Sequence, residues 1–313
     1  MSAIHTDTTD ATTASDTLSR LTRRQLIVVT GKGGVGKSAI TAALGKVLAA
    51  HGRRTLLLEI DPRENLHQML AVPPSGGEIV SVEDSLYLQN LKPQQVVDWI
   101  VERQVKIGLL VRRIQKNPVY HRFSEGAPGL REMAVIGHIQ RMVRGEVEGA
   151  PPLETVILDA PATGHSIYQL TAPRLFAETI HDGPFAELAR DAAGFLADPT
   201  ACGVVVVTLA EEMPVQEALE LRLALEENTG RGPECLVING LYPDLPAAPI
   251  ETGDALLRLW AERRHVNDHE LDRLRREWPG PRVDLPLLAI DQGPELIRAL
   301  YERLETGLMG VAT

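Results

Sequence analysis

Two lysines, Lys32 and Lys37, lie in one short glycine-rich segment of the sequence, GKGGVGKS at residues 31–38. The segment satisfies the pattern G-x-x-x-x-G-K-[ST], which binds nucleotide phosphates. Its glycines allow the backbone amides to come close to an anion, and the helix expected to begin at Ser38 adds partial positive charge. We therefore expect Lys37 to contact the β- and γ-phosphates of ATP, and the Ser38 hydroxyl to ligate Mg²⁺.

The other residues of this loop are predicted to form the rest of the ATP cradle. They are Gly33, Gly34, Val35, Gly36 and Ala39. Lys32 is different, because a second ammonium group cannot easily share the phosphate oxygens that Lys37 contacts. We expect it to project out of the loop, toward whatever approaches the nucleotide from outside. Positive charge on the transferred phosphate accelerates phosphoryl transfer, so both lysines are predicted catalytic residues.

The elements that must position this loop alternate along the chain as strands and helices. Amphipathic helical patterns occur at residues 38–50 and 214–228. The alternation predicts an α/β fold with a doubly wound, mostly parallel sheet, as in P-loop NTPases. Continuous apolar runs typical of buried parallel strands occur at residues 25–30, 55–60, 155–159, 203–208 and 235–239, with a weaker one at 86–90.

Two regions interrupt the alternation, at about residues 93–145 and 173–198, where we find no convincing strand pattern. They are predicted to form a helical insertion on a single P-loop domain that spans residues 25–313. The apolar positions of the insertion favour packing against the core over a groove for a client protein. Residues 1–24, rich in Thr, Asp, Ser and Ala, are predicted to form a disordered tail, with a partner-binding arm as the alternative.

Composition and charge argue against several classes of protein. The formal net charge of −10 disfavours a nucleic-acid partner. No window approaches the roughly 18 apolar residues of a membrane span, and the N-terminal segment lacks the apolar core of a secretory signal. The two cysteines, Cys202 and Cys235, form no C-x-x-C pair and are expected in the core. We therefore predict a cytoplasmic protein with no integral membrane segment.

The segment KGGVGKS at residues 32–38 resembles the deviant Walker A motif, K-G-G-x-G-K-[ST], of a group of P-loop ATPases of the SIMIBI type. Two further segments resemble the ArsA-like family of this group, which includes the arsenical-pump and tail-anchored-protein-targeting ATPases. The first is LEIDPRENL, in which Asp61-Pro62 resembles the start of the family's switch I, D-P-A-x-x-L. The second is VILDAPATGHS, which resembles the joined Walker B and switch II motif, D-T-A-P-T-G-H-T. The resemblance covers residues 25 to 305.

The resemblance also implies roles for residues outside the phosphate loop. Asp61 is expected to position the attacking water, as a third catalytic residue, and Asp159 to hold a Mg²⁺-bound water. Asn239, in VING, is expected to contact adenine. Pro286, in LPLLAIDQGPELI, is expected to pack near the base. The predicted metal site comprises Ser38, Asp61 and Asp159.

In this group of ATPases two subunits enclose two nucleotides, and the first lysine crosses to the other subunit's phosphate, which is the role implied for Lys32. We therefore predict a dimeric ATPase, either a homodimer or a heterodimer with a paralogue. Hydrolysis is useful only if two conformations differ in their affinity for a partner. ATP-driven opening and closing is thus expected to bind and release a protein client, related to membrane proteins. The alternatives are a ParA- or MinD-type positioning ATPase and a nucleotide-binding subunit of a heterodimeric ATPase.

Overall fold

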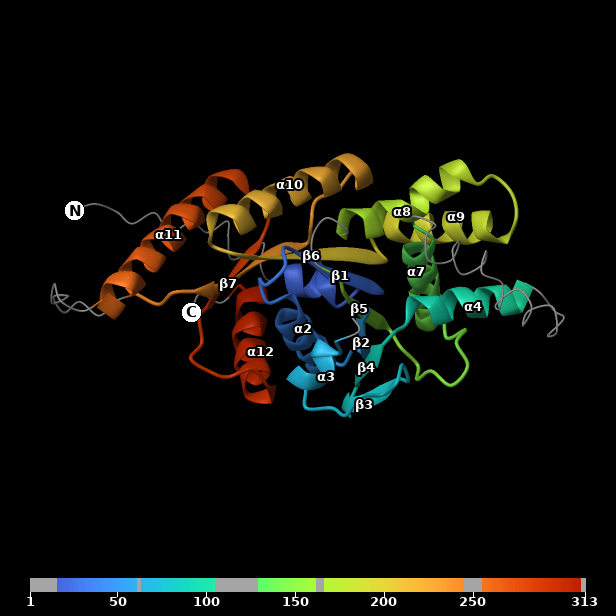
Figure 1. Ribbon diagram of the computed structural model, residues 1–313, viewed down its shortest axis with the longest axis horizontal. Helices are drawn as coiled ribbons and strands as arrows, with labels where there is room; N and C mark the ends of the chain where they lie inside the picture. The colour runs from blue at the N-terminus through green and yellow to red at the C-terminus, as the bar shows by residue number, and fades with distance from the viewer. Residues whose placement is uncertain (1–15, 61–62, 105–128, 162–165, 245–254, 311–313) are drawn as a thin grey trace.

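The computed structural model describes residues 16–60, 63–104, 129–161, 166–244 and 255–310. Within these residues, eight strands form one sheet in the order β3-β4-β2-β5-β1-β6-β7-β8 (Figure 1). All neighbouring strands are parallel except β3 and β4, which are antiparallel. The predicted α/β fold with a mostly parallel sheet is confirmed. The strands are Leu26–Thr30 (β1), Thr55–Glu59 (β2), Val80–Glu83 (β3), Leu86–Asn90 (β4), Thr155–Asp159 (β5), Cys202–Leu209 (β6), Cys235–Leu241 (β7) and Arg282–Pro286 (β8).

Helices cover both faces of the sheet (Figure 1). One face packs against α2, α3 and α12, and the other packs against α4 and α7 to α11. The helices are Lys37–Ala50 (α2), Asn65–Met69 (α3), Pro93–Gln104 (α4), Leu130–Val143 (α7), Ser166–Thr179 (α8), Pro184–Ala197 (α9), Glu212–Thr229 (α10), Ala255–Glu277 (α11) and Pro294–Leu308 (α12).

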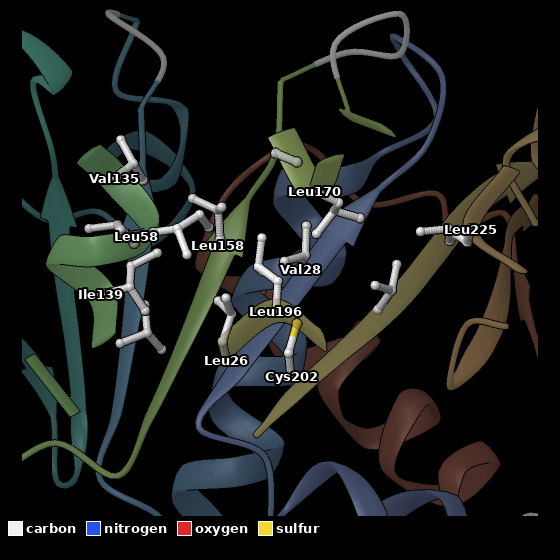
Figure 2. Packing of buried hydrophobic residues seen from close by; sticks show 14 of the residues in the cluster. Leu26, Val28, Leu58, Val135, Ile139, Leu158, Leu170, Leu196, Cys202 and Leu225 are labelled. Carbon is white, nitrogen blue, oxygen red and sulfur yellow. The ribbon is translucent and has the colours of Figure 1, made fainter. Parts of the chain in front are cut away.

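Both faces of the central strands are buried, which explains why their sequences are continuous apolar runs. In β1, Leu26 and Val28 belong to the cluster that includes α7 to α10, whereas Ile27 and Val29 belong to the cluster that includes α2 and α12. Figure 2 shows Leu26 and Val28 in the first of these clusters, with Leu158 of β5 beside them. Packing on both faces therefore fixes the position of the central strand, from whose end the glycine-rich loop begins.

All the predicted strands form, with small differences at their ends, but the sequence reasoning missed β3 and β8. Both lie at the edges of the sheet. In β3 the exposure of successive residues alternates, and β8 carries the charged Arg282 and Asp284. Edge strands bury fewer side chains than central ones, so neither contains a continuous apolar run.

The described part of the helical insertion packs against the core. Its apolar side chains in α4 and α7 belong to the large cluster on that face of the sheet, as the prediction of core packing requires. They are Val96, Val97, Ile100, Leu130, Met133, Ile136, Ile139 and Met142. The prediction for residues 105–128 falls outside the described residues.

The prediction of a disordered tail over residues 1–24 is wrong for residues 16–24. Residues 16–21 are helical, and Leu18 and Leu21 are buried in the cluster around α2 and α12. Arg20 and Arg24 form ion pairs with Glu234 at 3.0 and 2.6 Å. Two leucines at helical spacing and these ion pairs stabilise the segment, whose polar composition had suggested disorder. Residues 1–15 lie outside the described residues.

The two cysteines are core residues, as predicted. Both are buried, and burial raises the pKa of Cys202 to about 11 and that of Cys235 to about 12. Neither thiol therefore ionises readily near neutral pH. Among the described helices, none combines the length and the apolar character needed to cross a bilayer.

His138, in α7, is a histidine whose pKa lies well below its ordinary value. Its burial, together with the nearby Arg141 guanidinium, lowers the pKa from 6.5 to about 4. The folded chain therefore favours neutral His138, whereas the unfolded chain binds a proton there below about pH 6.5. The corresponding stability is present at neutral pH and is lost as the pH falls through about 6.5 toward 4.

We expect the free energy of unfolding to fall by about 2 kcal/mol more in the wild type than in a His138→Asn variant when the pH changes from about 7.5 to about 5. Chemical denaturation of both chains at both pH values measures this difference. Because the other titrating groups are the same in the two chains, equal pH dependence would show that His138 is not the cause.

Candidate functional site

The glycine-rich loop follows β1, in the middle of the sheet, and leads into α2. Because β1, β2, β5, β6 and β7 are parallel, their carboxyl ends lie at one edge of the sheet, where open α/β folds bind ligands. Glu59, Asp159 and Asn239 come from the ends of β2, β5 and β7. The topology therefore brings polar side chains from three separate parts of the sequence to the loop's edge of the sheet.

Two glycines allow the loop to pack closely against its neighbours. A Cβ atom on Gly31 would lie 2.0 Å from the carbonyl oxygen of Val207, and one on Gly36 would lie 2.4 Å from Nδ2 of Asn239. Gly36 also has a φ of 93°, in the left-handed region that favours glycine. A side chain at Gly31 would push the loop away from β6, whereas one at Gly36 would displace the Asn239 side chain and would need an unfavourable φ.

Asn239 is directed to the loop. Its Nδ2 donates a hydrogen bond to the carbonyl oxygen of Val35 at 3.0 Å. This contact, which the sequence reasoning did not foresee, holds the loop against β7. The role of Asn239 in contacting adenine stays a prediction.

Ser38 and Asp159 meet at the start of α2. The Ser38 hydroxyl donates to Oδ2 of Asp159 at 2.6 Å, and the Thr41 hydroxyl donates to Oδ1 at 3.3 Å. Asp159 is 8% exposed, so its carboxylate is largely shielded from water. The structure thus joins two of the three predicted metal ligands, one from the loop and one from the end of β5.

Lys37 and Lys32 have different partners. The Lys37 ammonium donates to the backbone carbonyl oxygen of Lys32 at 3.0 Å. Burial lowers the pKa of Lys37, and the nearby Asp159 carboxylate partly opposes this shift. The Lys32 ammonium forms an ion pair with Oε1 of Glu217, in α10, at 2.5 Å. The two ammonium groups therefore do not converge on one point.

Glu59 is a carboxyl group of this region that the sequence reasoning missed. It is 0% exposed and pairs in register with Asp159 across β2 and β5. Burial raises its pKa to about 7, with a smaller contribution from the Asp159 charge, while hydrogen bonds from the backbone of Asn65 and Leu66 oppose the shift. The signal in the sequence was a glutamate that ends the apolar run TLLLE, since a glutamate in such a run is rarely buried without a partner.

The described residues fit a nucleotide with Mg²⁺. The loop amides and Lys37, at the amino end of α2, offer positive charge to phosphates. The Ser38 hydroxyl and the Asp159 carboxylate are the oxygen ligands that Mg²⁺ prefers, and this ion usually keeps several waters as further ligands. A Mg²⁺ site would therefore need few protein groups, and the two that the structure brings together are of the right type.

The other predicted site residues lie as follows. Pro286 ends β8, next to β7, which carries Asn239. Ala39 is buried in α2 and packs into the core, so only its backbone can serve a ligand. Asp61, predicted as a catalytic and metal-binding residue, falls outside the described residues.

Comparison with known proteins gives a consistent set of relatives. A family model described as anion-transporting ATPase matches residues 24–184. ATPase BagA of Mycobacterium tuberculosis is 31% identical over 223 residues, which cover 67% of this chain and 62% of the relative. The arsenical pump-driving ATPase of Acidiphilium multivorum is 27% identical over 238 residues, covering 70% and 40% of the two chains. ATPase GET3C of Arabidopsis thaliana is 24% identical over 172 residues, covering 50% and 44%. The matches thus span less than two thirds of the length of each relative.

Proposed function

Because this chain belongs to the anion-transporting ATPase family, we propose that it hydrolyses ATP in the presence of Mg²⁺ at the loop between β1 and α2. The proposal includes a dimer in which each chain supplies Lys32 to the nucleotide of the other. It also includes opening and closing of this dimer, in the cytoplasm, to bind and release a protein client.

The observation that carries the proposal is the contact between Ser38 and Asp159. The Ser38 hydroxyl donates a hydrogen bond to the carboxylate at 2.6 Å, which leaves the lone pairs of its oxygen available to ligate a cation. A phosphate-binding loop alone supports binding of an anion. The Ser38 hydroxyl and the Asp159 carboxylate, hydrogen-bonded to each other where the loop ends, add a site for the divalent ion that accompanies ATP.

Each residue of the site then has a distinct task. When bound, ATP with Mg²⁺ supplies the phosphoryl group to be transferred and the divalent charge that offsets its negative charge. Lys37 and the loop amides bind and orient the phosphates, and Ser38 and Asp159 fix the metal position. Asp61 orients the attacking water, so its replacement by asparagine is expected to spare ATP binding and abolish turnover.

Lys32 is the residue that links hydrolysis to dimerisation in this proposal. In the single chain its ammonium is paired with Glu217 of α10. Both side chains are partly exposed, 30% and 28%, so the ion pair contributes little and is easily exchanged. A phosphate from a second chain carries more negative charge than one carboxylate, so Lys32 is expected to leave Glu217 when the dimer closes on ATP.

A mixing experiment tests the dimer and the ATPase together. Lys32→Ala and Asp61→Asn are each expected to hydrolyse ATP poorly. When equal amounts of the two are mixed and their subunits exchange freely, half of the dimers contain one chain of each kind. In such a dimer the Lys32→Ala chain has an intact Asp61 and receives Lys32 from its neighbour. Random pairing therefore predicts recovery of about a quarter of the wild-type rate.

Measured rates of the mixture and of each variant alone decide between the arrangements. If the mixture only averages its two components, Lys32 acts within its own chain or the protein is not a dimer. If the wild type itself releases no phosphate from ATP, the proposed activity is wrong. Capture of untagged Lys32→Ala chain by affinity-tagged Asp61→Asn chain from the same mixture is the control for exchange of subunits.

The client-binding part of the proposal rests on the need for a partner whose affinity changes during the ATP cycle. Apart from Val96 and Trp99 of α4, which line a cavity of about 530 Å³, the described apolar side chains of α4 and α7 pack into the core and do not line a groove for a client. We therefore place client binding on a surface formed or altered when two chains close together, and not on these two helices as they pack in one chain.

A further inference from the structure

The end of β7 carries Asn239, the residue that ties this strand to the phosphate-binding loop. Its Nδ2 donates to the carbonyl oxygen of Val35 at 3.0 Å. The strand is irregular at this point, because Gly240 has a φ of 66° and the pairing with β8 shifts register between Ile238 and Leu241. Such an irregularity disrupts the ladder locally, so the position of Asn239 depends on what holds the chain just beyond it.

Asn267, in α11, holds the chain at that point. Its Oδ1 accepts a hydrogen bond from the backbone nitrogen of Tyr242 at 2.8 Å, and its Nδ2 donates one to the carbonyl oxygen of Ala210 at 2.9 Å. Tyr242 directly follows β7, and Ala210 directly follows β6. The register of the two strands ends at Leu209 and Asn239. One side-chain amide therefore links the two segments beyond their last register pair.

The chemistry of an asparagine suits this link. Tyr242 offers a donor and Ala210 an acceptor, so a single orientation of the amide satisfies both partners. Asn267 is 4% exposed and Ala210 is 1% exposed. An apolar side chain at this position would leave both backbone groups without these partners, which costs free energy where the groups are buried.

The same face of α11 holds the segment that leaves β7. Nη1 of Arg264 donates to the Tyr242 carbonyl oxygen at 2.6 Å, and Nε1 of Trp260 donates to that of Pro243 at 3.0 Å. Trp260, Arg264 and Asn267 are spaced i, i+4 and i+7, which places them on one side of the helix. Asn267 adds to this face the contact with the end of β6.

We propose that Asn267 is a positioning residue for Asn239 and, through Asn239, for the phosphate-binding loop. This inference rests on the proposed binding of ATP at that loop. Gly31 packs the loop closely against Val207 of β6, and Asn239 holds it against β7. By linking the ends of β6 and β7, Asn267 keeps these two supports in a fixed relation, so the empty loop retains the conformation that receives phosphates. Asn267 does not itself touch ATP.

A double-mutant cycle tests whether Asn267 acts through Asn239. Asn267→Leu keeps the approximate size of the side chain and removes both hydrogen bonds. We expect it to raise the Kd for a fluorescent ATP analogue about tenfold, because the loop loses part of its preorganisation. In chains that already carry Asn239→Ala, the same substitution is expected to change the Kd less than about twofold, since the contact on which it acts is gone. Additive effects of the two substitutions would overturn the inference.

Gln216→Leu is the matched control for a general loosening of α11. It removes an amide of α10 that accepts a hydrogen bond from Arg273 of α11, and it leaves both hydrogen bonds of Asn267 in place. We expect its Kd to stay within about twofold of that of the wild type. A loss of affinity equal to that of Asn267→Leu would show that the packing of α11, and not the link between the strand ends, sets the affinity.

Asn267→Ala is the milder variant, because it leaves room for water to take over part of the link. We expect it to raise the Kd about threefold. If Asn267→Leu does not melt cooperatively, Asn267→Ala takes its place in the cycle with Asn239→Ala, and additive effects would again overturn the inference.

Hydrogen exchange of the nucleotide-free chain gives a readout that does not depend on ATP. Peptides covering Tyr242 are expected to exchange at least about tenfold faster in Asn267→Leu than in Gln216→Leu, because the Tyr242 amide loses its acceptor. Equal exchange in the two variants would also overturn the inference. If exchange changes as expected but the wild type does not bind the ATP analogue, the contact made by Asn267 stands and the proposed function is wrong.

Discussion

Replacing Lys37 by alanine is expected to weaken ATP binding at least about 100-fold and to remove hydrolysis with it. In the nucleotide-free chain the Lys37 ammonium is held by the backbone carbonyl oxygen of Lys32, inside the loop that is to receive the phosphates. Burial lowers the pKa of Lys37, whereas the negative charge of a nearby phosphate favours the ammonium form. The ammonium then donates a strong charge-assisted hydrogen bond to the phosphate. Equilibrium titration with a fluorescent ATP analogue measures the dissociation constant directly.

Lys32→Ala is the matched control, because it removes a second lysine from the same loop. Lys32 pairs with Glu217 instead of with the loop, so its loss is expected to change the dissociation constant of a single chain by less than about threefold. Titration at a protein concentration that keeps the chains apart isolates this effect. If Lys32→Ala weakens binding as much as Lys37→Ala does, both lysines contact the nucleotide of their own chain and the cross-subunit role is wrong.

The sequence predicts those parts of the fold and the site that depend on short local patterns. The loop at residues 31–38 combines fixed spacing with a buried strand before it and a helix after it, and each signal is complete within a few residues. The central strands are predictable for a similar reason, since burial on both faces leaves an unbroken apolar run. The edge strands β3 and β8 lack such a run, so short-range patterns do not identify them.

The sequence patterns do not reveal contacts between segments that lie far apart in the chain. Glu217 lies far from Lys32 in the chain, and only the packing of α10 beside the loop brings them together. The helix at residues 16–21 is another example, because its composition suggests disorder and its stability comes from the distant Glu234 and the core. Glu59 is an intermediate case. Its position at the end of an apolar run hints at a special role, but its partners become clear only from the geometry.

Replacing Asp159 by asparagine is expected to reduce ATP turnover at least about 100-fold while leaving the fold intact. The asparagine keeps the size of the side chain, but its amide group can donate where a carboxylate only accepts. The Ser38 hydroxyl then loses the charged acceptor that it contacts at 2.6 Å. Removing the carboxylate also ends its repulsion of the buried Glu59, so we expect no loss of thermal stability.

The dependence on Mg²⁺ distinguishes a metal role of Asp159 from a purely structural one. If Asp159 fixes the metal position, the variant binds ATP normally with EDTA present and loses only the gain in affinity that Mg²⁺ provides. Thr41→Val, which removes the longer hydrogen bond to the same carboxylate and keeps the shape of the side chain, is the matched control and is expected to retain that gain. If Asp159→Asn instead weakens ATP binding equally with and without Mg²⁺, the carboxylate acts by holding the loop through Ser38 and Thr41. In that case the metal must be held by other groups, and the observation that carries the proposed function would lose its force.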